Sequence, residues 1–453
     1  MPPMSRELVR TSGETVGRPR GGGLYMWALA IVVGVLAAGG VILLRTLIAY
    51  AEFLAFQNAA GRLTSKLAEL VWWKRMLGPI VGGAVVALLL RLGISIGWGP
   101  APRTFGITDV VQHRRLRGTI RSTTLALRDS FLSAIVTVVS LGWGGAAGRE
   151  EAAGHLGASL AMLPGRLLGL DAAARRMLIG MGVAGAIAAA LHAPIAAVFL
   201  TRELVLRRQP LSALGPVAVA SATGWLVALT QFGGRPVIDI PDPGLIPTAF
   251  PIAALAVTPL IAIFAWGAVV IWTRTRVMTA AAASRIRVPL WILPFPGGIL
   301  LGVVALAFPQ ALGIGYEPLA TGLSGNYGAQ LMPVLALAKI AAAAITFAFR
   351  WGGGQIAPSL YVGAMIGSTM GVVIGLMVGD AASGQVYFGV LGMAIAFAVL
   401  MNAPVAAGLL ALELSSSPAI GAVSLACAFI ACMGVRRLAP AAPDEAGETL
   451  RWR

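Results

Sequence analysis

The sequence predicts an all-α protein that crosses a membrane many times. Of its 453 residues, 58% are hydrophobic and 11% are charged, whereas a typical soluble domain has about 25% charged residues. The apolar residues form stretches long enough to cross a hydrocarbon core of about 30 Å. Glycine, proline and charged residues interrupt several of these stretches. Because broken helices at membrane depth are tolerated inside protein or beside a cavity, the interruptions indicate a transport path.

The positive charge of the chain fits this fold class. Lys and Arg number 34 against 18 Asp and Glu, a net charge of +16. Without a soluble domain to present this charge, we expect it to face anionic membrane lipid and not nucleic acid. Residues 1–22 are expected to be a basic cytoplasmic tail and residues 439–453 a short C-terminal tail. Cys427 and Cys432 are expected to be small buried hydrophobic residues.

Eleven apolar stretches are expected to supply the helices of the domain, which covers residues 23–438. The first is too long for the apolar region of a signal peptide, so it is expected to remain as a helix. In order, the stretches cover residues 24–47, 76–97, 124–147, 173–201, 211–231, 250–273, 289–308, 331–349, 356–378, 386–413 and 418–438.

An internal repeat divides these stretches into two sets. The segment from His192 to Leu204 aligns without a gap with the segment from Asn402 to Leu414, and each holds Ala-Pro followed by a Glu in register. Apolar membrane helices resemble one another by chance, but matched Pro and Glu disfavour that reading. We therefore expect a duplication of about residues 25–232 and 250–438, with a site between the halves.

Two glycine-rich breaks are the candidate site. Trp143-Gly-Gly-Ala-Ala-Gly-Arg-Glu150 and Trp351-Gly-Gly-Gly-Gln-Ile-Ala-Pro358 each lead into an apolar helix. Glycine lets the backbone approach a ligand closely, and the N–H groups of a helix start attract anions. Two such N-termini without a metal-ligand cluster favour a weakly hydrated anion, and no metal or cofactor is expected. The alternative is that these glycines only pack helices together.

Glu150 is the candidate gate. It lies in the first turn of its helix, where its carboxylate can compete with a substrate anion, so protonation or displacement of its side chain would vacate the position. The alternative is an ordinary first-turn Glu worth a few tenths of a kcal/mol. Successive helical side chains diverge by about 100°, so either Glu150 or Glu151, and not both, is expected to face the path.

The order of these motifs resembles the CLC family of chloride channels and chloride/proton antiporters, in the bacterial form that lacks cytoplasmic CBS domains. The resemblance covers about residues 25–438 and rests on Gly148-Arg149-Glu150, Gly354 to Pro358, the paired Ala-Pro segments and Gly313-Ile-Gly315-Tyr316. It implies a homodimer in the inner membrane with a pore in each subunit. It also implies about 18 tilted, broken helices in two repeats of inverted topology.

The resemblance also implies the roles of individual residues. Glu150 falls on the outer gating glutamate of the family. Backbone groups of two loops fall on its anion-binding positions: Gly148, Arg149 and Glu151 in the first, and Gly354, Gln355, Ile356 and Ala357 in the second. A third loop, Thr104-Phe105-Gly106, falls on the family's serine loop, with Phe105 at the position of the anion-coordinating serine and Thr104 as a substitute.

Departures from the family pattern bear on function. Glu151-Ala152 replaces the family's Gly-Pro, and no counterpart of the central pore tyrosine is found. The inner proton-accepting glutamate of the antiporters falls on Leu204, one residue after Glu203. This pattern favours uncoupled chloride conduction. The alternative is a proton-coupled antiporter of chloride, nitrate or fluoride, with Glu203 or His155 as the proton carrier.

An enzyme embedded in the membrane is the remote alternative. Such an enzyme needs a nucleophile–base pair or a metal constellation. The chain has three scattered histidines, no His-x-x-x-His or Glu-x-x-His pair and no Gly-x-Ser-x-Gly motif. We therefore expect a transport protein and not an enzyme.

Overall fold

The computed structural model describes residues 23–57, 62–96, 110, 127–207, 209–234, 237–242, 247, 249–285 and 287–438. These residues form 16 α-helices and three short 3-10 helices, and their β structure is limited to an isolated bridge between Gly148 and Gly354. Nine of the described helices are long and apolar enough to cross a membrane. The predicted fold class, an all-α multi-pass membrane protein, is confirmed.

The helices of the two halves are as follows. The first half contains α1 (Gly23–Phe56), α2 (Leu63–Glu69), α3 (Trp72–Ser95), α5 (Leu127–Gly142), α6 (Glu150–Leu167), α7 (Ala172–Leu191), α8 (Pro194–Leu204) and α9 (Gly215–Phe232). The second contains α10 (Ala249–Arg285), α11 (Pro294–Ala307), α12 (Tyr316–Leu323), α13 (Leu331–Ala348), α14 (Ile356–Val378), α15 (Ala381–Met401), α16 (Pro404–Ser415) and α17 (Pro418–Leu438).

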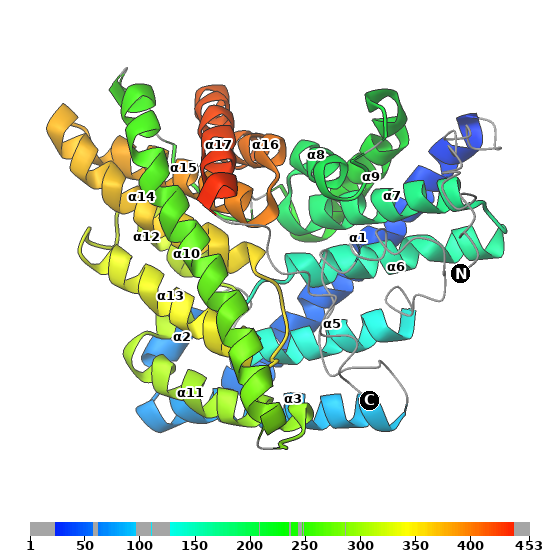
Figure 1. The fold of residues 1–453 in the computed structure, drawn as a ribbon, viewed down its shortest axis with the longest axis horizontal. Helices are drawn as coiled ribbons and strands as arrows, with labels where there is room; N and C mark the ends of the chain where they lie inside the picture. Colours follow the sequence, from blue (N-terminus) through cyan, green and yellow to red (C-terminus); the bar gives the residue numbers. More distant parts are fainter. Residues whose placement is uncertain are drawn as a thin grey trace, which may run out of the picture.

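Two helices form the centre of the molecule. In the 18-residue apolar segments of α7 and of α15, 89% of the residues are buried inside the protein, whereas in that of α10 the share is 33%. Helix α10 crosses the outside of the second half, as Figure 1 shows, and exposes large apolar side chains such as Ile263 and Leu255. In water such a surface would be unfavourable, whereas lipid tails are as apolar as the side chains themselves.

The same helix packing occurs once in each half. Helix α6 meets α7 at Gly157 and Gly182, and α14 meets α15 at Gly363 and Gly392. A Cβ atom on any of these four glycines would collide with the backbone carbonyl oxygen of its partner. Close backbone approach through glycine is a common way to join helices in a membrane. These four glycines occupy corresponding positions of the two predicted repeats.

The Ala-Pro motifs mark the predicted helix breaks. Helices α7 and α15 end at His192 and Asn402, whose φ angles of 56° and 51° place them in the left-handed region. The following alanines, Ala193 and Ala403, lie outside the helical region, because a residue before proline is pushed out of it. Pro194 and Pro404 then start α8 and α16, where the missing N–H has no helical partner.

Several predicted boundaries are wrong. The stretches 24–47 and 250–273 are too short, since α1 extends to Phe56 and α10 to Arg285. The expected boundaries lie where polar or charged residues interrupt the apolar stretch. Such residues are compatible with an α-helix, so the helix continues past them. The short helices α2 and α12 were not expected, because a segment of seven or eight residues carries little periodic signal.

Candidate functional site

The two glycine-rich breaks meet inside the molecule. The backbone N–H of Gly148 donates to the carbonyl of Gly354 at 2.7 Å, and the N–H of Gly354 donates to the carbonyl of Gly148, also at 2.7 Å. Next to this bridge, the N–H of Ala146 donates to Oγ1 of Thr346 at 3.0 Å. The helices that follow, α6 and α14, therefore begin side by side, as the paired motifs predicted.

Glu150 is the first residue of α6, and its side chain is completely buried. The hydroxyl of Tyr316 donates to its Oε1 at 2.6 Å, and Nε of Arg149 lies 3.8 Å from the same oxygen. The other oxygen, Oε2, accepts no hydrogen bond from the residues that the structure describes. A buried carboxylate oxygen normally has a partner, so this atom marks a position where a partner can bind.

The free oxygen of Glu150 faces the start of α14. A Cβ atom on Gly148 would collide with Oε2 of Glu150 and would lie 3.0 Å from the backbone nitrogen of Ala357. The Glu150 carboxylate and the Ala357 amide therefore border the same small volume beside Gly148. Ile356 and Ala357 are buried in the first turn of α14, whose N–H groups have no partner four residues earlier in the helix.

Tyr316 is held against Glu150 by a constrained loop. Gly315 precedes α12 with a φ of 93°, and a Cβ atom there would lie 2.9 Å from the Tyr361 ring and 3.0 Å from Nζ of Lys339. Lys339 is completely buried and donates to the carbonyls of Ala311 at 3.1 Å and Gly313 at 2.7 Å. Lys339 thus holds the loop that contains Gly313 and Gly315, and this loop orients Tyr316.

Arg45 is a second cation close to the site. It lies within α1, its guanidinium carbon is 3.5 Å from the Phe232 ring centroid, and it interacts electrostatically with Arg149, Tyr316 and Glu150. Its Nη1 is buried without a hydrogen bond among the described residues. Sequence reasoning missed Arg45, Tyr316 and Lys339 as site residues. A lone cation within an apolar stretch, as at Arg45 and Lys339, was the available signal.

Glu151 differs from the expectation that a single carboxylate faces the path. Its Oε1 accepts the backbone N–H of Gln355 at 2.7 Å. Gln355 is the N-cap residue of α14. The two adjacent carboxylates therefore both reach the start of α14. Glu150 lies beside Gly148 and Ala357, and Glu151 binds Gln355. The third predicted loop, Thr104-Phe105-Gly106, lies outside the described residues.

The candidate proton carriers have structural partners. Glu203, near the end of α8, accepts the N–H groups of Val405 at 3.1 Å and Ala406 at 2.9 Å. His155 is buried in α6, and its Nδ1 lies 3.1 Å from Oγ of Ser130. Leu204, the position of the family's inner glutamate, is 7% exposed.

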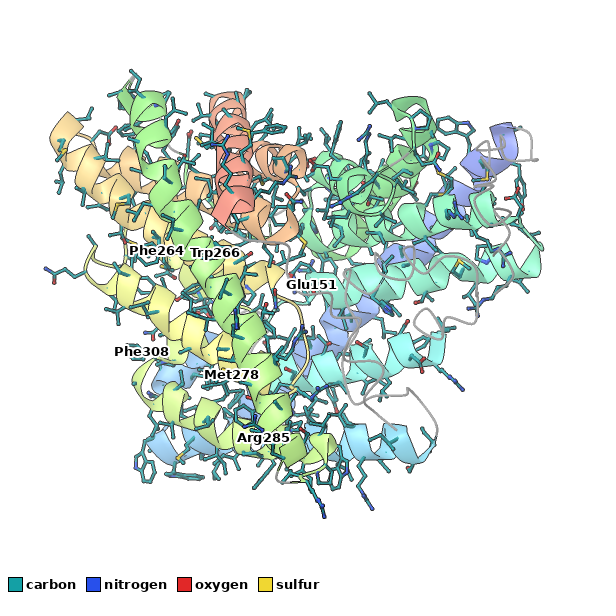
Figure 2. All side chains as sticks on the ribbon, in the orientation of Figure 1. Glu151, Phe264, Trp266, Met278, Arg285 and Phe308 are labelled. Carbon is teal, nitrogen blue, oxygen red and sulfur yellow. The ribbon has the colours of Figure 1, made fainter. Side chains whose placement is uncertain are left out.

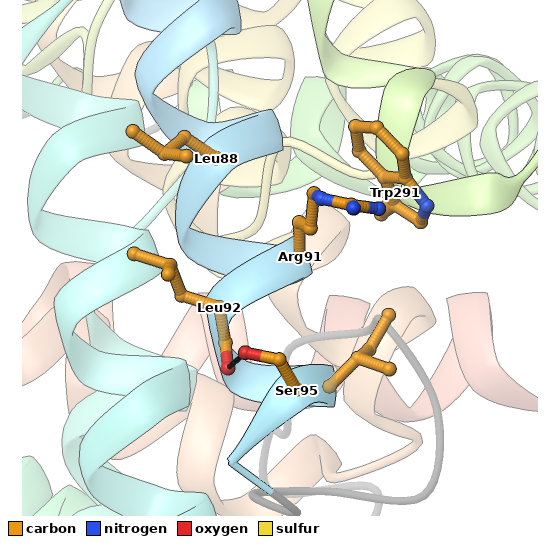
Figure 3. A pocket seen from close by; sticks show the side chains of 6 residues that line it. Leu88, Arg91, Leu92, Ser95 and Trp291 are labelled. Atoms are coloured by element: carbon orange, nitrogen blue, oxygen red, sulfur yellow. Dashed lines mark hydrogen bonds between the residues drawn. The ribbon is translucent and has the colours of Figure 1, made fainter.

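No cluster of three or more metal-ligating side chains exists among the described residues. A surface pocket beside α3 contains none of the predicted site residues. In that pocket the Arg91 guanidinium lies 4.8 Å from the Trp291 ring centroid (Figure 3), an arrangement typical of an anchor at a membrane surface.

Broken helices whose N-termini meet beside a buried carboxylate define a membrane transport protein built from two repeats. The sequence model of the family described as "Voltage gated chloride channel" matches residues 82–436. The chain therefore belongs to this family, and the resemblance drawn from its motifs is confirmed.

Similar proteins agree with this assignment. The chain is 28% identical to chloride channel protein CLC-e of Arabidopsis thaliana over 88% of its own length and 58% of that protein. It is 27% identical to the voltage-gated ClC-type chloride channel ClcB of Salmonella typhi, over 85% of its own length and 90% of that protein.

Solved structures share the fold. A slow cyanobacterial Cl⁻/H⁺ antiporter superposes with a TM-score of 0.77 at 18% identity, covering 91% of this chain and 95% of that one. A CLC-type fluoride/proton antiporter gives a TM-score of 0.71 at 19% identity, covering 90% and 95%.

Proposed function

We propose that this protein transports a small inorganic anion, with chloride as the first candidate, through a pore in each subunit that Glu150 gates. The observation that carries the proposal is the meeting of the α6 and α14 N-termini at the Gly148–Gly354 bridge, with the buried Glu150 carboxylate between them. Backbone N–H groups and helix dipoles of this kind stabilise an anion without a metal.

In this proposal the Glu150 carboxylate takes the place of the transported anion. Its Oε1 is held by the Tyr316 hydroxyl, and its Oε2 faces the first turn of α14. When Glu150 takes up a proton or its side chain swings out, the negative charge leaves the helix ends and a mobile anion replaces it. Anion flux therefore rises as the pH falls.

Uncoupled conduction is favoured over antiport. A proton path through the protein needs a titratable group on the side opposite the gate, and Leu204 has none. The neighbouring Glu203 carboxylate is engaged by two backbone N–H groups of α16. These bonds hold its side chain in place at the start of α16.

Proton-coupled antiport is the second candidate. Two proteins with this fold are described as a Cl⁻/H⁺ antiporter and a fluoride/proton antiporter. A gating carboxylate at Glu150 is compatible with either mode. In an antiporter, Glu203 or His155 would be the proton carrier, and nitrate or fluoride would be alternative cargo.

We further propose a homodimer in a bacterial inner membrane, surrounded by lipid. The ClcB relatives of bacteria support this localisation. Exposed apolar side chains on α8, α9 and α17, such as Ile195, Leu226 and Phe429, are available to cover a twofold contact.

The test is anion flux from proteoliposomes of the purified protein, with proton flux recorded at the same time. Chloride, nitrate and fluoride are compared between about pH 4.5 and 7.5. Wild-type flux is expected to rise as the pH falls, and Glu150→Gln should give high flux at every pH because the amide carries no titratable charge. Absence of anion flux in the wild type would refute the function, and an unchanged pH profile in Glu150→Gln would refute the gate.

A further inference from the structure

The site contains a second carboxylate, that of Glu151, which accepts a hydrogen bond from a backbone N–H group. Glu151 is the second residue of α6 and is half-buried. Figure 2 shows it near the middle of the molecule, at the start of α6. Its Oε1 accepts the N–H of Gln355 at 2.7 Å. As the N-cap residue of α14, Gln355 has an N–H group that the helix itself does not use.

The backbone around Gln355 is shaped to admit this carboxylate. A Cβ atom on Gly354 would lie 2.6 Å from Cβ, 2.8 Å from Cγ and 2.9 Å from Cδ of Glu151, so only glycine leaves room for the side chain. The two bonds between Gly148 and Gly354 hold the loops in this register. The contact is therefore part of the same close approach that brings the two helix N-termini together.

Glu150 supplies an independent observation that this place binds an anion. Its side chain is completely buried, and its Oε2 is without a hydrogen bond among the described residues while it borders the same volume as the Ala357 amide. The start of α14 thus has one carboxylate bound to the Gln355 amide and another beside the Ala357 amide. A helix N-terminus carries about half a positive charge, too little to hold two carboxylates and a mobile anion together.

We propose that Glu151 is a second tethered carboxylate, which competes with the transported anion for the Gln355 N–H. The proposal rests on the proposed function, in which the α14 N-terminus binds that anion. The Gln355 N–H has one hydrogen to donate, so the anion binds it only when the Glu151 side chain has left. Glu151 therefore lowers the affinity of the site for anions, and its displacement accompanies each binding event there.

The test compares chloride binding and chloride flux in the purified full-length protein and in Glu151→Ala, Glu151→Gln and Asp171→Ala. Asp171 is the matched control, because its carboxylate also accepts a backbone N–H at a helix start, that of Ala174 at 2.8 Å, but at α7. Chloride binding is measured by isothermal titration calorimetry at pH 7.5, and flux is measured from proteoliposomes.

Glu151→Ala is expected to bind chloride roughly tenfold more tightly than the wild type, the ratio expected for one charge-assisted hydrogen bond. Its chloride flux should also rise. Glu151→Gln keeps an oxygen acceptor for the Gln355 N–H without the charge, so a smaller rise is expected. Asp171→Ala should leave the chloride affinity unchanged. Rescue of function by Gln after a loss in Ala would indicate a purely structural bond and would overturn the proposal.

The failure of this proposal is distinguishable from that of the proposed function. A wild-type protein that neither binds nor transports chloride refutes the function. A wild-type protein that does both, with no gain of affinity in either Glu151 variant, refutes only the second carboxylate. If Glu151→Ala does not fold, the near-isosteric Glu151→Gln alone decides, because a competing charge is absent there too.

Discussion

The Glu150 carboxyl group is completely buried, and three side chains from other positions interact with it. The Tyr316 hydroxyl donates to Oε1, the Arg149 guanidinium lies next to the same oxygen, and Arg45 acts on it from α1. A buried carboxylate is costly without such partners. In the proposed function, the balance between these contacts and a hydrated position of the Glu150 side chain decides how often the pore is open.

Removing the Tyr316 hydroxyl should weaken the closed position of Glu150. A hydrogen bond to a charged group is worth about 1.5–3 kcal/mol, so Tyr316→Phe is expected to raise anion flux at neutral pH roughly tenfold. Tyr361→Phe is the control, because the Tyr361 hydroxyl is buried without a hydrogen bond in the described part of the chain. Proteoliposome flux measures both variants, and equal flux in the two would contradict the role of Tyr316.

Neutralising Arg45 should lower the affinity of the site for anions. A fixed positive charge near the path raises the local concentration of anions, so Arg45→Gln is expected to weaken chloride binding by roughly three- to tenfold. Arg91→Gln is a matched control, since Arg91 also lies in an apolar helix against an aromatic ring but borders none of the site residues. A chloride affinity that is the same in both variants would exclude a role for Arg45.

At the scale of elements, the half-helices α8 and α16 cap each other. Glu203 of α8 accepts the N–H groups of Val405 and Ala406 at the start of α16. Glu413 of α16 accepts those of Ile195 at 2.8 Å and Ala196 at 2.7 Å at the start of α8. Each proline-started helix thus receives from its counterpart the capping group that its own sequence lacks.

Each of these carboxylates should therefore stabilise the fold. Glu203→Ala and Glu413→Ala are each expected to lower the free energy of unfolding by about 1–2 kcal/mol, and the corresponding Gln variants by less because the amide oxygen still accepts. Thermal unfolding in detergent measures all four. If Glu203→Ala were as stable as the wild type, the carboxylate would be free for another role, such as carrying protons.

A pH-dependent contribution is expected at the start of α15. Hydrogen bonds from Ser383 hold the pKa of Asp380 below its ordinary value. A carboxyl whose folded pKa is lowered stabilises the fold above its unfolded pKa, and this stabilisation is lost as the pH falls through the folded pKa. The difference in melting temperature between the wild type and Asp380→Ala should therefore shrink below about pH 4. A difference that does not change with pH would contradict this.

At the scale of the whole molecule, the proposed site lies at the contact between the two halves. Figure 1 places α6–α9 and α14–α17 next to one another, and the Gly148–Gly354 bridge and the α8–α16 pair join them. Neither half contains a complete site. The proposed gate, Glu150, is in the first half, whereas the Ala357 amide near its carboxyl group and Tyr316, which donates to it, are in the second.

Coupling to protons is a property of this whole path, so one added carboxylate should not create it. Leu204→Glu is expected to conduct chloride without stoichiometric proton counter-flux, because Glu203 remains bound to α16 and the sequence predicts no counterpart of the family's central tyrosine. Proton uptake recorded during chloride flux tests this. Sustained uphill proton movement driven by a chloride gradient in the wild type would reverse the conclusion and assign antiport.

The sequence alone determined the class of fold, and it predicts the two repeats and a gate at Glu150. Its composition is that of a membrane protein, and its Pro and Gly residues marked where helices break, because these two residue types act on the backbone locally. It did not determine which side chains meet. Arg45 comes from α1 in the first half, whereas Tyr316 and Lys339 come from α12 and α13 in the second. The Glu151–Gln355 bond also spans both halves. Such contacts depend on how helices pack in space, which no local pattern encodes.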